Sequence, residues 1–296
     1  MTSIAIAIPS LNGAKYLRET LRSIEMQTVK PDEVIISDNH SSDDSIAIIQ
    51  TYTNLNIKLI SPATFVSMSK NWNFAASHVQ SDWFIMLSND DLLRNTAILK
   101  LKEIISNIPD NIGVISCKSE IIDEKSKLLF GKYKVGRARF RSEFDFLKEN
   151  IRYLHINAAS VAIKTQAWRG VGKFPENYDY IHDLVFYQRM ILQFGILESK
   201  EVIARYRTYL IRAGSDLRTR QTEDDFSIYE NTDLKFYISR YPQLEVVYNS
   251  EKFAKSSKQT VKPKIKQLWR MAVISVMSGF RRLEGIMHKS GFPSNF

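Results

Sequence analysis

The segment Ile4-Ala5-Ile6-Ala7-Ile8-Pro9-Ser10-Leu11-Asn12 decides the fold class of this chain. Its first five residues form a continuous apolar run, which is typical of a strand buried on both faces of a sheet. We expect a strand over Ile4–Ile8 that ends at Pro9. Apolar side chains then recur at helical spacing from Tyr16 to Ile24, so a helix should follow the strand directly.

The alternation of strand and helix continues as far as residue 106. Further strands are expected at 33–37, 57–60 and 83–87, and further helices at 41–52, 69–78 and 95–106. This order predicts an α/β fold with a mainly parallel sheet flanked by helices. After Gly113 the pattern loosens, and we expect strands at 114–117, 119–122, 158–163 and 202–206, a hairpin or loop at 125–141, and a helix at 183–194. From residue 224 onward the chain reads as helical.

The composition is that of an ordinary globular protein. Hydrophobic residues make up 44% of the 296 positions and charged residues 25%, which excludes a mostly disordered or fibrous chain. The one cysteine, Cys117, cannot form an internal disulfide, so a reducing compartment is expected. The N-terminal segment has no basic region ahead of its apolar run, so we do not read it as a signal peptide.

The net charge of +9 is concentrated at the end of the sequence. Residues 251–296 carry ten Lys or Arg and two Glu, which accounts for +8 of the total. The first 250 residues are therefore nearly neutral. The basic end and the main body need separate explanations.

Polar loops follow three of the expected strands. In parallel α/β sheets, ligands bind beyond the carboxyl ends of the strands, which directs attention to residues 9–12, 37–44 and 88–91. The first loop holds only Gly13, so it lacks the Gly-x-Gly-x-x-Gly turn of dinucleotide-binding folds. The chain also has no phosphate-binding loop of the Gly-x-x-x-x-Gly-Lys-Ser/Thr type.

Acidic residues stand out in two of these loops. Asp90 and Asp91 are adjacent carboxylates that repel each other unless a cation compensates them, and Mg²⁺ or Mn²⁺ bridging to a diphosphate would do so. They could equally cap the helix that follows. Asp38, at the end of the second strand, also has an ordinary explanation as a turn residue.

Taken together and in order, the motifs resemble family 2 glycosyltransferases of the GT-A fold. The resemblance rests on residues 4–12, the helix pattern at 16–28, Glu33–Asp44, Lys70-Asn71-Trp72-Asn73 and Leu87-Ser88-Asn89-Asp90-Asp91. It is strong over residues 3–110 and traceable to about residue 215. It implies a GT-A domain over 1–220, with a nucleotide-binding half at 1–110 and an acceptor half at 111–220, followed by a helical C-terminal extension over 221–296.

The resemblance also implies roles for individual residues. Asp38 matches the carboxylate that accepts a hydrogen bond from the N3–H of a pyrimidine base. Asp90 and Asp91 match the later acids of an Asp-x-Asp-Asp metal motif whose first position is Ser88 here, and they are expected to hold Mn²⁺ or Mg²⁺. The remaining expected nucleotide-binding residues are Pro9, Ser10, Asn12, Lys70, Asn71, Ser88 and Asn89, together with Asp90.

A second motif lies at the start of the expected helix 183–194. Asp183 falls on the family's catalytic acid, with His182 in place of a glutamate, so the resemblance assigns it as the base that deprotonates the acceptor hydroxyl. Asp183 could instead be a simple helix cap, and Asp179 is the fallback base. Tyr209 stands where many members carry a histidine. Arg207 or Arg212 could then face the diphosphate.

The basic C-terminal region predicts a surface helix. Apolar residues recur at helical spacing within residues 262–289, flanked by Lys and Arg, and the apolar core of this stretch is about half the ~20 residues that a membrane span needs. A basic amphipathic helix of this kind favours an anionic membrane surface. Alternatively, the apolar stripe packs on the catalytic domain. No nucleic-acid-binding module is recognisable, so no nucleic-acid partner is expected.

These observations predict a metal-dependent, inverting glycosyltransferase. The donor would be a UDP-sugar, or else a dTDP-sugar, and the acceptor a saccharide or a lipid-linked glycan. A cytoplasmic enzyme, peripheral on the inner face of the membrane, is expected. The rival hypothesis is an inactive GT-A partner of a polysaccharide-synthesis complex; a nucleotidyltransferase is disfavoured because its Gly-rich first loop is absent.

Overall fold

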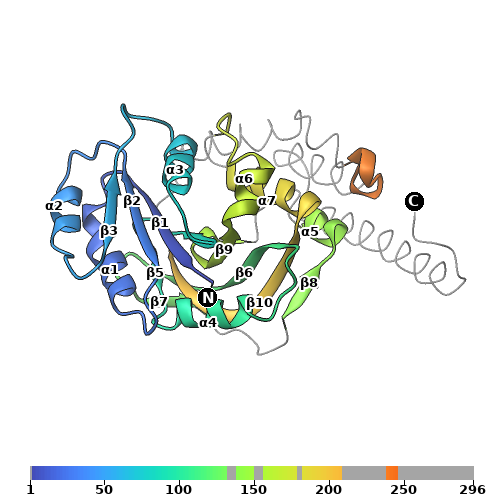
Figure 1. Cartoon of the computed structure of the whole chain (residues 1–296), viewed down its shortest axis with the longest axis horizontal. Coiled ribbons are helices and arrows are strands. Elements are labelled where there is room, and N and C mark those ends of the chain that lie inside the picture. The colour runs from blue at the N-terminus through green and yellow to red at the C-terminus, as the bar shows by residue number, and fades with distance from the viewer. Residues whose placement is uncertain (1, 132–137, 150–155, 179–181, 209–237, 246–296) are drawn as a thin grey trace, which may run out of the picture. The chain divides into compact units, whose positions relative to one another are not determined.

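The computed structural model describes residues 2–131, 138–149, 156–178, 182–208 and 238–245 (Figure 1). Within them a sheet runs in the order β3-β2-β1-β4-β9-β6-β10-β5, and helices flank it. The expected α/β class is therefore confirmed. The chain divides into two compact units, residues 1–146 with 153–226 and residues 147–152 with 227–296. The proposed boundary at residue 220 stays a prediction, and nearly all of the C-terminal extension lies outside the described residues.

The first half of the chain forms a parallel sheet with β1 in its middle. β1 pairs with β2 on one side and with β4 on the other, and β3 adds to β2, all in parallel register. The elements are β1 (Ile4–Ser10), α1 (Ala14–Glu25), β2 (Glu33–Asp38), α2 (Ser45–Gln50), β3 (Ile57–Ile60), α3 (Met68–Ser77), β4 (Trp83–Met86), β5 (Leu92–Leu93) and α4 (Ala97–Ile105).

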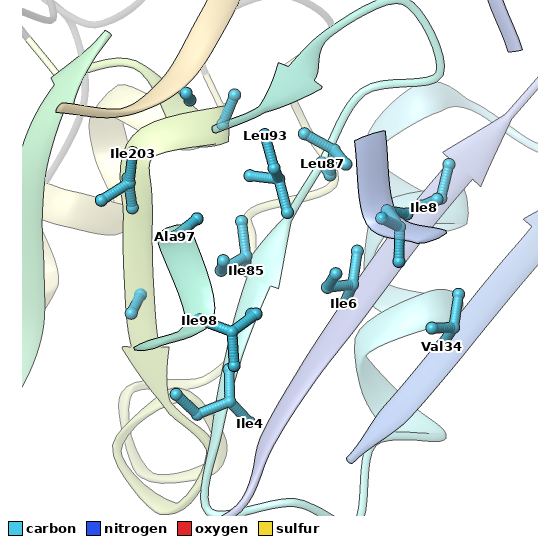
Figure 2. Packing of buried hydrophobic residues seen from close by; sticks show 14 of the residues in the cluster. Ile4, Ile6, Ile8, Val34, Ile85, Leu87, Leu93, Ala97, Ile98 and Ile203 are labelled. Carbon is cyan, nitrogen blue, oxygen red and sulfur yellow. The ribbon is translucent and has the colours of Figure 1, made fainter. Parts of the chain in front are cut away.

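The two faces of strand β1 carry side chains of different size. Ile4, Ile6 and Ile8 belong to the main apolar cluster, which includes side chains of α1 and α4 (Figure 2). Successive residues of a strand point to opposite faces, so Ala5 and Ala7 face the other side, where α3 packs on β1. The small alanines let α3 approach closely.

The second half of the chain joins the first through an antiparallel strand. β9 lies between β4 and β6 and pairs antiparallel with both, while β10 runs parallel to β6. The remaining elements are β6 (Ile112–Ile122), β7 (Leu128–Phe130), β8 (Arg139–Arg141), α5 (Glu143–Glu149), the 3₁₀ turn η1 (Ala158–Ser160), β9 (Val161–Lys164), α6 (Thr165–Val171), α7 (His182–Gln193) and β10 (Gly195–Arg207).

Several expected boundaries were wrong. β1 continues through Pro9 to Ser10, because its pairing with β4 has already ended at Ala7 and Pro9 therefore needs no N–H on that side. The expected helix at 41–52 begins only at Ser45, since the preceding residues bond to the loop after β1. Two strands expected at 114–122 form one, β6, and the basic segment after it contributes two separate short strands.

Candidate active site

The carboxyl ends of β1 and β2 bring the first predicted site residues together. Ser10 lies opposite Asp38 in the parallel register, and its carbonyl oxygen accepts a hydrogen bond from the N–H of Asn39 at 2.8 Å. The hydroxyl of Ser10 accepts a hydrogen bond from the side-chain amide of Asn89, at 3.1 Å, from the loop after β4. Ser10 thus joins all three loops that the sequence singles out.

Asp38 is buried, and one of its two carboxylate oxygens accepts a hydrogen bond from the protein. Its side chain is 1% exposed, and Oδ2 accepts the N–H of Ser41 at 3.0 Å. Oδ1 is also buried and has no hydrogen-bond partner among the described residues. Buried polar atoms in folded proteins almost always have a partner. A ligand N–H group reaching Oδ1 would supply one.

Asn12 fastens the first loop to the second. Its backbone is left-handed, with φ at 47°, and its side-chain oxygen accepts the N–H of Ser42 at 2.8 Å. Its own N–H donates to the Ser41 hydroxyl at 2.9 Å. Two residues further, the N–H of Ala14 donates to Asp43. Asn12 therefore holds the first loop against the second, while Leu11 beside it is exposed and Pro9 half-buried.

A fourth loop, residues 61–67, is tied to the Asp38 turn by residues that sequence reasoning missed. The side chain of Asn39 bonds to both the carbonyl and the N–H of Val66, at 2.8 and 3.0 Å. The Ser61 hydroxyl donates to the Asp38 carbonyl at 2.6 Å, and His40 Nε2 lies 3.0 Å from the Pro62 carbonyl. Only the cluster of polar residues after β2 could have indicated this connection.

Helix α3 starts beside this loop and carries Lys70 and Asn71. The Ser37 hydroxyl donates to Asn71 Oδ1 at 2.5 Å, and Asn71 Nδ2 donates to the Ser37 carbonyl at 3.2 Å. Asn71 is buried and joins α3 to the end of β2, next to Asp38. Lys70 is exposed, so its cation is accessible to a ligand.

The acidic turn, residues 88–91, packs against the start of α1. The Asn89 carbonyl accepts the hydroxyl of Thr20 at 3.1 Å, and Asn89 leaves no room beside Gly13. A Cβ atom at Gly13 would lie 2.3 Å from Asn89 Nδ2. Ser88 and Asp90 are half-buried, whereas Asp91 is 2% exposed. The carboxylate with more access to a ligand is therefore that of Asp90.

Arg207 is the last residue of β10. The sequence left open that its side chain faces the diphosphate, but the structure shows it bonded to the acidic turn. Its N–H donates to Asp91 Oδ1 at 2.8 Å, and its Nε donates to the Asp90 carbonyl at 2.8 Å. Its side chain is fully buried and forms an ion pair with Glu19 at 3.0 Å. Arg207 is part of the framework under the acidic turn.

The acidic turn fits a divalent cation only if phosphate oxygens complete its shell. Among the residues described, no group of three or more His, Cys, Asp or Glu side chains could hold a metal ion. Mg²⁺ characteristically uses one or two protein carboxylates together with substrate phosphates, and Asp90 with Asp91 would meet that requirement. Asp91 Oδ1 accepts the N–H of Arg207, and Asp90 is the more exposed of the two acids.

The predicted base lies in the first turn of α7. Asp183 is half-buried, and its Oδ1 accepts the N–H of Leu184 at 2.8 Å. Burial raises the pKa of the Asp183 carboxyl, and the neighbouring His182 opposes that rise only in part. A carboxylate with a raised pKa is a stronger base. Its role as the base stays a prediction, and the fallback base Asp179 lies outside the described residues.

Helix α3 also reaches the beginning of α7. The Trp72 ring lies edge-on to the His182 ring, with centroids 4.8 Å apart, and to the Phe174 ring at 5.3 Å. The next residue, Asn73, bonds to both the carbonyl and the N–H of Phe174, at 2.8 and 2.9 Å. Asn71, bonded to the end of β2, and His182, the neighbour of Asp183, are thus linked through one helix. Tyr209, Arg212 and the basic stretch 262–289 lie outside the described residues.

The family model "Glycosyl transferase family 2" matches residues 5–162. An O-antigen chain rhamnosyltransferase, WbaN, of Salmonella anatum is 27% identical over 196 residues, 64% of this chain and 61% of its own length. The chain spans only 61–64% of the length of the first three curated relatives.

Solved structures share the fold at lower sequence identity. TarS 1–349 of S. aureus in complex with UDP has a TM-score of 0.62 and 17% identity, covering 90% of this chain and 78% of that one. The mannosyltransferase PcManGT of Pyrobaculum calidifontis, in complex with GDP-Man and Mn²⁺, has a TM-score of 0.56 and 14% identity, covering 95% and 82%. Both likenesses concern the fold alone.

Proposed function

The chain belongs to glycosyltransferase family 2, and from that premise we propose that it transfers a sugar from a nucleotide-diphosphate donor to an acceptor hydroxyl. The acceptor is a saccharide or a lipid-linked glycan. The observation that carries the proposal is Asp38, whose buried Oδ1 has no hydrogen-bond partner within the described part of the chain and lies at the edge of the sheet where α/β folds bind ligands.

Asp38 selects the base of the donor. An ionised carboxylate only accepts hydrogen bonds, so it matches the N3–H of uracil or thymine and rejects cytosine, whose N3 carries no hydrogen. We favour UDP, which is the ligand of the TarS neighbour, over dTDP. The base and ribose are bounded by Pro9, Ser10, Asn12, Asn71, Ser88 and Asn89, and Lys70 offers its exposed cation to the phosphates.

The acidic turn receives the diphosphate. Asp90, assisted by Asp91, would hold Mn²⁺ or Mg²⁺, which neutralises the charge that develops on the leaving diphosphate. PcManGT, the structural neighbour described with Mn²⁺, is consistent with this assignment. Because Ser88 replaces the first acid of the motif, it contributes a hydroxyl to the ribose side of the pocket in place of a carboxylate.

Asp183 acts as the general base. Its carboxylate takes the proton of the acceptor hydroxyl while the acceptor oxygen bonds to the anomeric carbon and the bond from that carbon to the diphosphate oxygen breaks. Attack opposite the leaving group inverts the anomeric centre. The raised pKa of Asp183 strengthens it as a proton acceptor.

The site works at a membrane in this proposal. Residues 262–289 would lie on an anionic bilayer on its cytoplasmic side, bringing the enzyme to lipid-linked acceptors. In the part of the chain that the structure describes, no helix is long and apolar enough to cross a membrane. The rival function, an inactive assembly partner, differs in binding the donor without consuming it.

Calorimetric titration of the whole chain with UDP, dTDP and CDP, with and without Mn²⁺, tests the proposal. UDP should bind, Mn²⁺ should tighten it, and CDP should bind far more weakly. Asp38→Asn should weaken UDP binding about tenfold, because a charge-assisted hydrogen bond is worth roughly 1.5–3 kcal/mol and a neutral one about 1. Asp44→Asn, an exposed acid in the same loop, is the matched control. Equal binding of UDP and CDP would contradict the proposal.

A further inference from the structure

Arg207 makes more polar contacts than its position at the end of a strand requires. Besides its bonds to Asp90 and Asp91, its Nη1 donates to the Ser126 hydroxyl at 2.9 Å and to the Asp123 carbonyl at 3.1 Å. Nη2 pairs with Glu19 at 3.0 Å, and the guanidinium lies 4.2 Å from the centre of the Tyr16 ring. One side chain thereby joins the acidic turn to α1 and to the turn at 123–126.

Such an arrangement is costly unless every donor is used. A buried guanidinium loses its hydration, and only good hydrogen-bond geometry with a compensating charge repays that loss. Arg207 meets both conditions, since its nitrogens are bonded and Glu19 supplies the charge. A hydrophobic residue of similar volume could fill the same space more simply. The contacts therefore point to a role in fixing the parts that they join.

The two bonds to the acidic turn are complementary. The main-chain N–H of Arg207 holds the carboxylate of Asp91, while Nε holds the carbonyl of the preceding residue, Asp90. A single residue thus fixes both the backbone of the turn and the orientation of one of its carboxylates. Residues that hydrogen-bond to metal ligands without touching the metal typically lower the metal affinity about 10- to 100-fold when they are replaced.

We infer that Arg207 is a positioning residue that sets the affinity of the Asp90–Asp91 turn for a divalent cation and the donor diphosphate. This inference rests on the proposed function of the turn. Arg207 touches neither ligand in this account. It acts by holding the turn in the shape that binds them, with α1 and the 123–126 turn as its support.

The test uses the full chain with Arg207→Lys, which keeps the charge but loses the planar set of five donors. Calorimetry with UDP, with and without Mn²⁺, should show UDP binding without metal within twofold of the wild type, whereas the Mn²⁺-dependent tightening falls about tenfold. Arg205→Lys is the matched control, because Arg205 lies two residues earlier on β10 and pairs with Glu120 instead. It should leave the metal effect intact. Hydrogen exchange of residues 88–93 should rise in Arg207→Lys alone.

Unchanged Mn²⁺-dependent binding in folded Arg207→Lys would overturn the inference. If that variant does not melt cooperatively, Glu19→Gln with Ser126→Ala removes the charge of one side-chain partner of the guanidinium and the hydroxyl of the other. A metal effect weakened about threefold or more then supports the inference, and an unchanged one overturns it. A wild type that binds UDP with no response to Mn²⁺ would instead contradict the proposed role of the acidic turn, and the inference with it.

Discussion

The indole of Trp72 lies edge-on to the imidazole of His182, at 83° and a centroid distance of 4.8 Å. Trp72 follows Asn71, which is bonded to the end of β2, and His182 precedes the proposed base Asp183. The contact therefore connects the strand end that carries Asp38 to the first turn of α7. Edge-to-face pairs of this kind add about 0.5–1.5 kcal/mol beyond the area they bury.

Replacing Trp72 should loosen the first turn of α7. Trp72→Leu is expected to lower the free energy of unfolding by about 2–4 kcal/mol and to speed hydrogen exchange at 182–186, because the partner of the His182 ring is lost. Trp72→Phe keeps an aromatic edge and should restore most of the protection. Phe74→Leu, on the same helix but in contact with His78, is the control. Unaltered exchange in Trp72→Leu would show that α7 holds its position without this contact.

Asp183→Asn should stabilise the protein while it removes transfer. The raised pKa means that folding favours the protonated carboxyl, so wild-type stability declines as the pH rises through the range from its ordinary 3.8 to the higher folded value. The variant carries no such group. Its melting temperature should exceed that of the wild type at pH 7, and the difference should vanish below about pH 4. Loss of a general base should slow transfer about 10²- to 10⁴-fold. Full transfer by this variant would remove Asp183 from the base role.

A side chain at Gly13 should displace Asn89. In Gly13→Ala the new Cβ would lie 2.3 Å from Asn89 Nδ2, so Asn89 must move and release Ser10. Overpacking of this kind costs about 1–3 kcal/mol, and UDP affinity should fall with it. The double variant Gly13→Ala/Asn89→Ala removes the clash and should be less destabilised than the sum of its single changes. Gly170→Ala, where the nearest atom is 3.8 Å away, should leave UDP binding unchanged.

Deletion after Glu251 should reduce sedimentation of the protein with vesicles that contain anionic lipid. The deleted segment, residues 252–296, carries ten Lys or Arg and one Glu, a net charge of +9, and each Lys or Arg near such a surface contributes about 1 kcal/mol. Vesicles of neutral lipid alone, and anionic vesicles at high salt, are the controls. If the shortened chain sediments as strongly as the full chain, the apolar stripe of residues 262–289 has some other partner.

The sequence predicted the first half of the fold well because local patterns determine it. The apolar run of β1 and the polar residues after β1, β2 and β4 specify both the parallel strands and the edge where Ser10, Asp38 and Asn89 meet. Contacts between distant segments left no such signal. Nothing near Arg207 indicates that it bonds to Asp90 and Asp91, more than a hundred residues earlier. The roles of the individual site residues stay predictions.

The antiparallel pairing of β9 with β4 has a consequence for chimeras between this chain and its relatives. β4 is buried throughout, and on the side away from β1 its partner comes from residues 161–164. A chimera joined at residue 110 would take β4 from one parent protein and β9 from the other. A fragment ending at residue 110 would expose the hydrophobic edge of β4, which favours aggregation. A stable chimera should therefore keep β9 with the first half and replace only the segments after it.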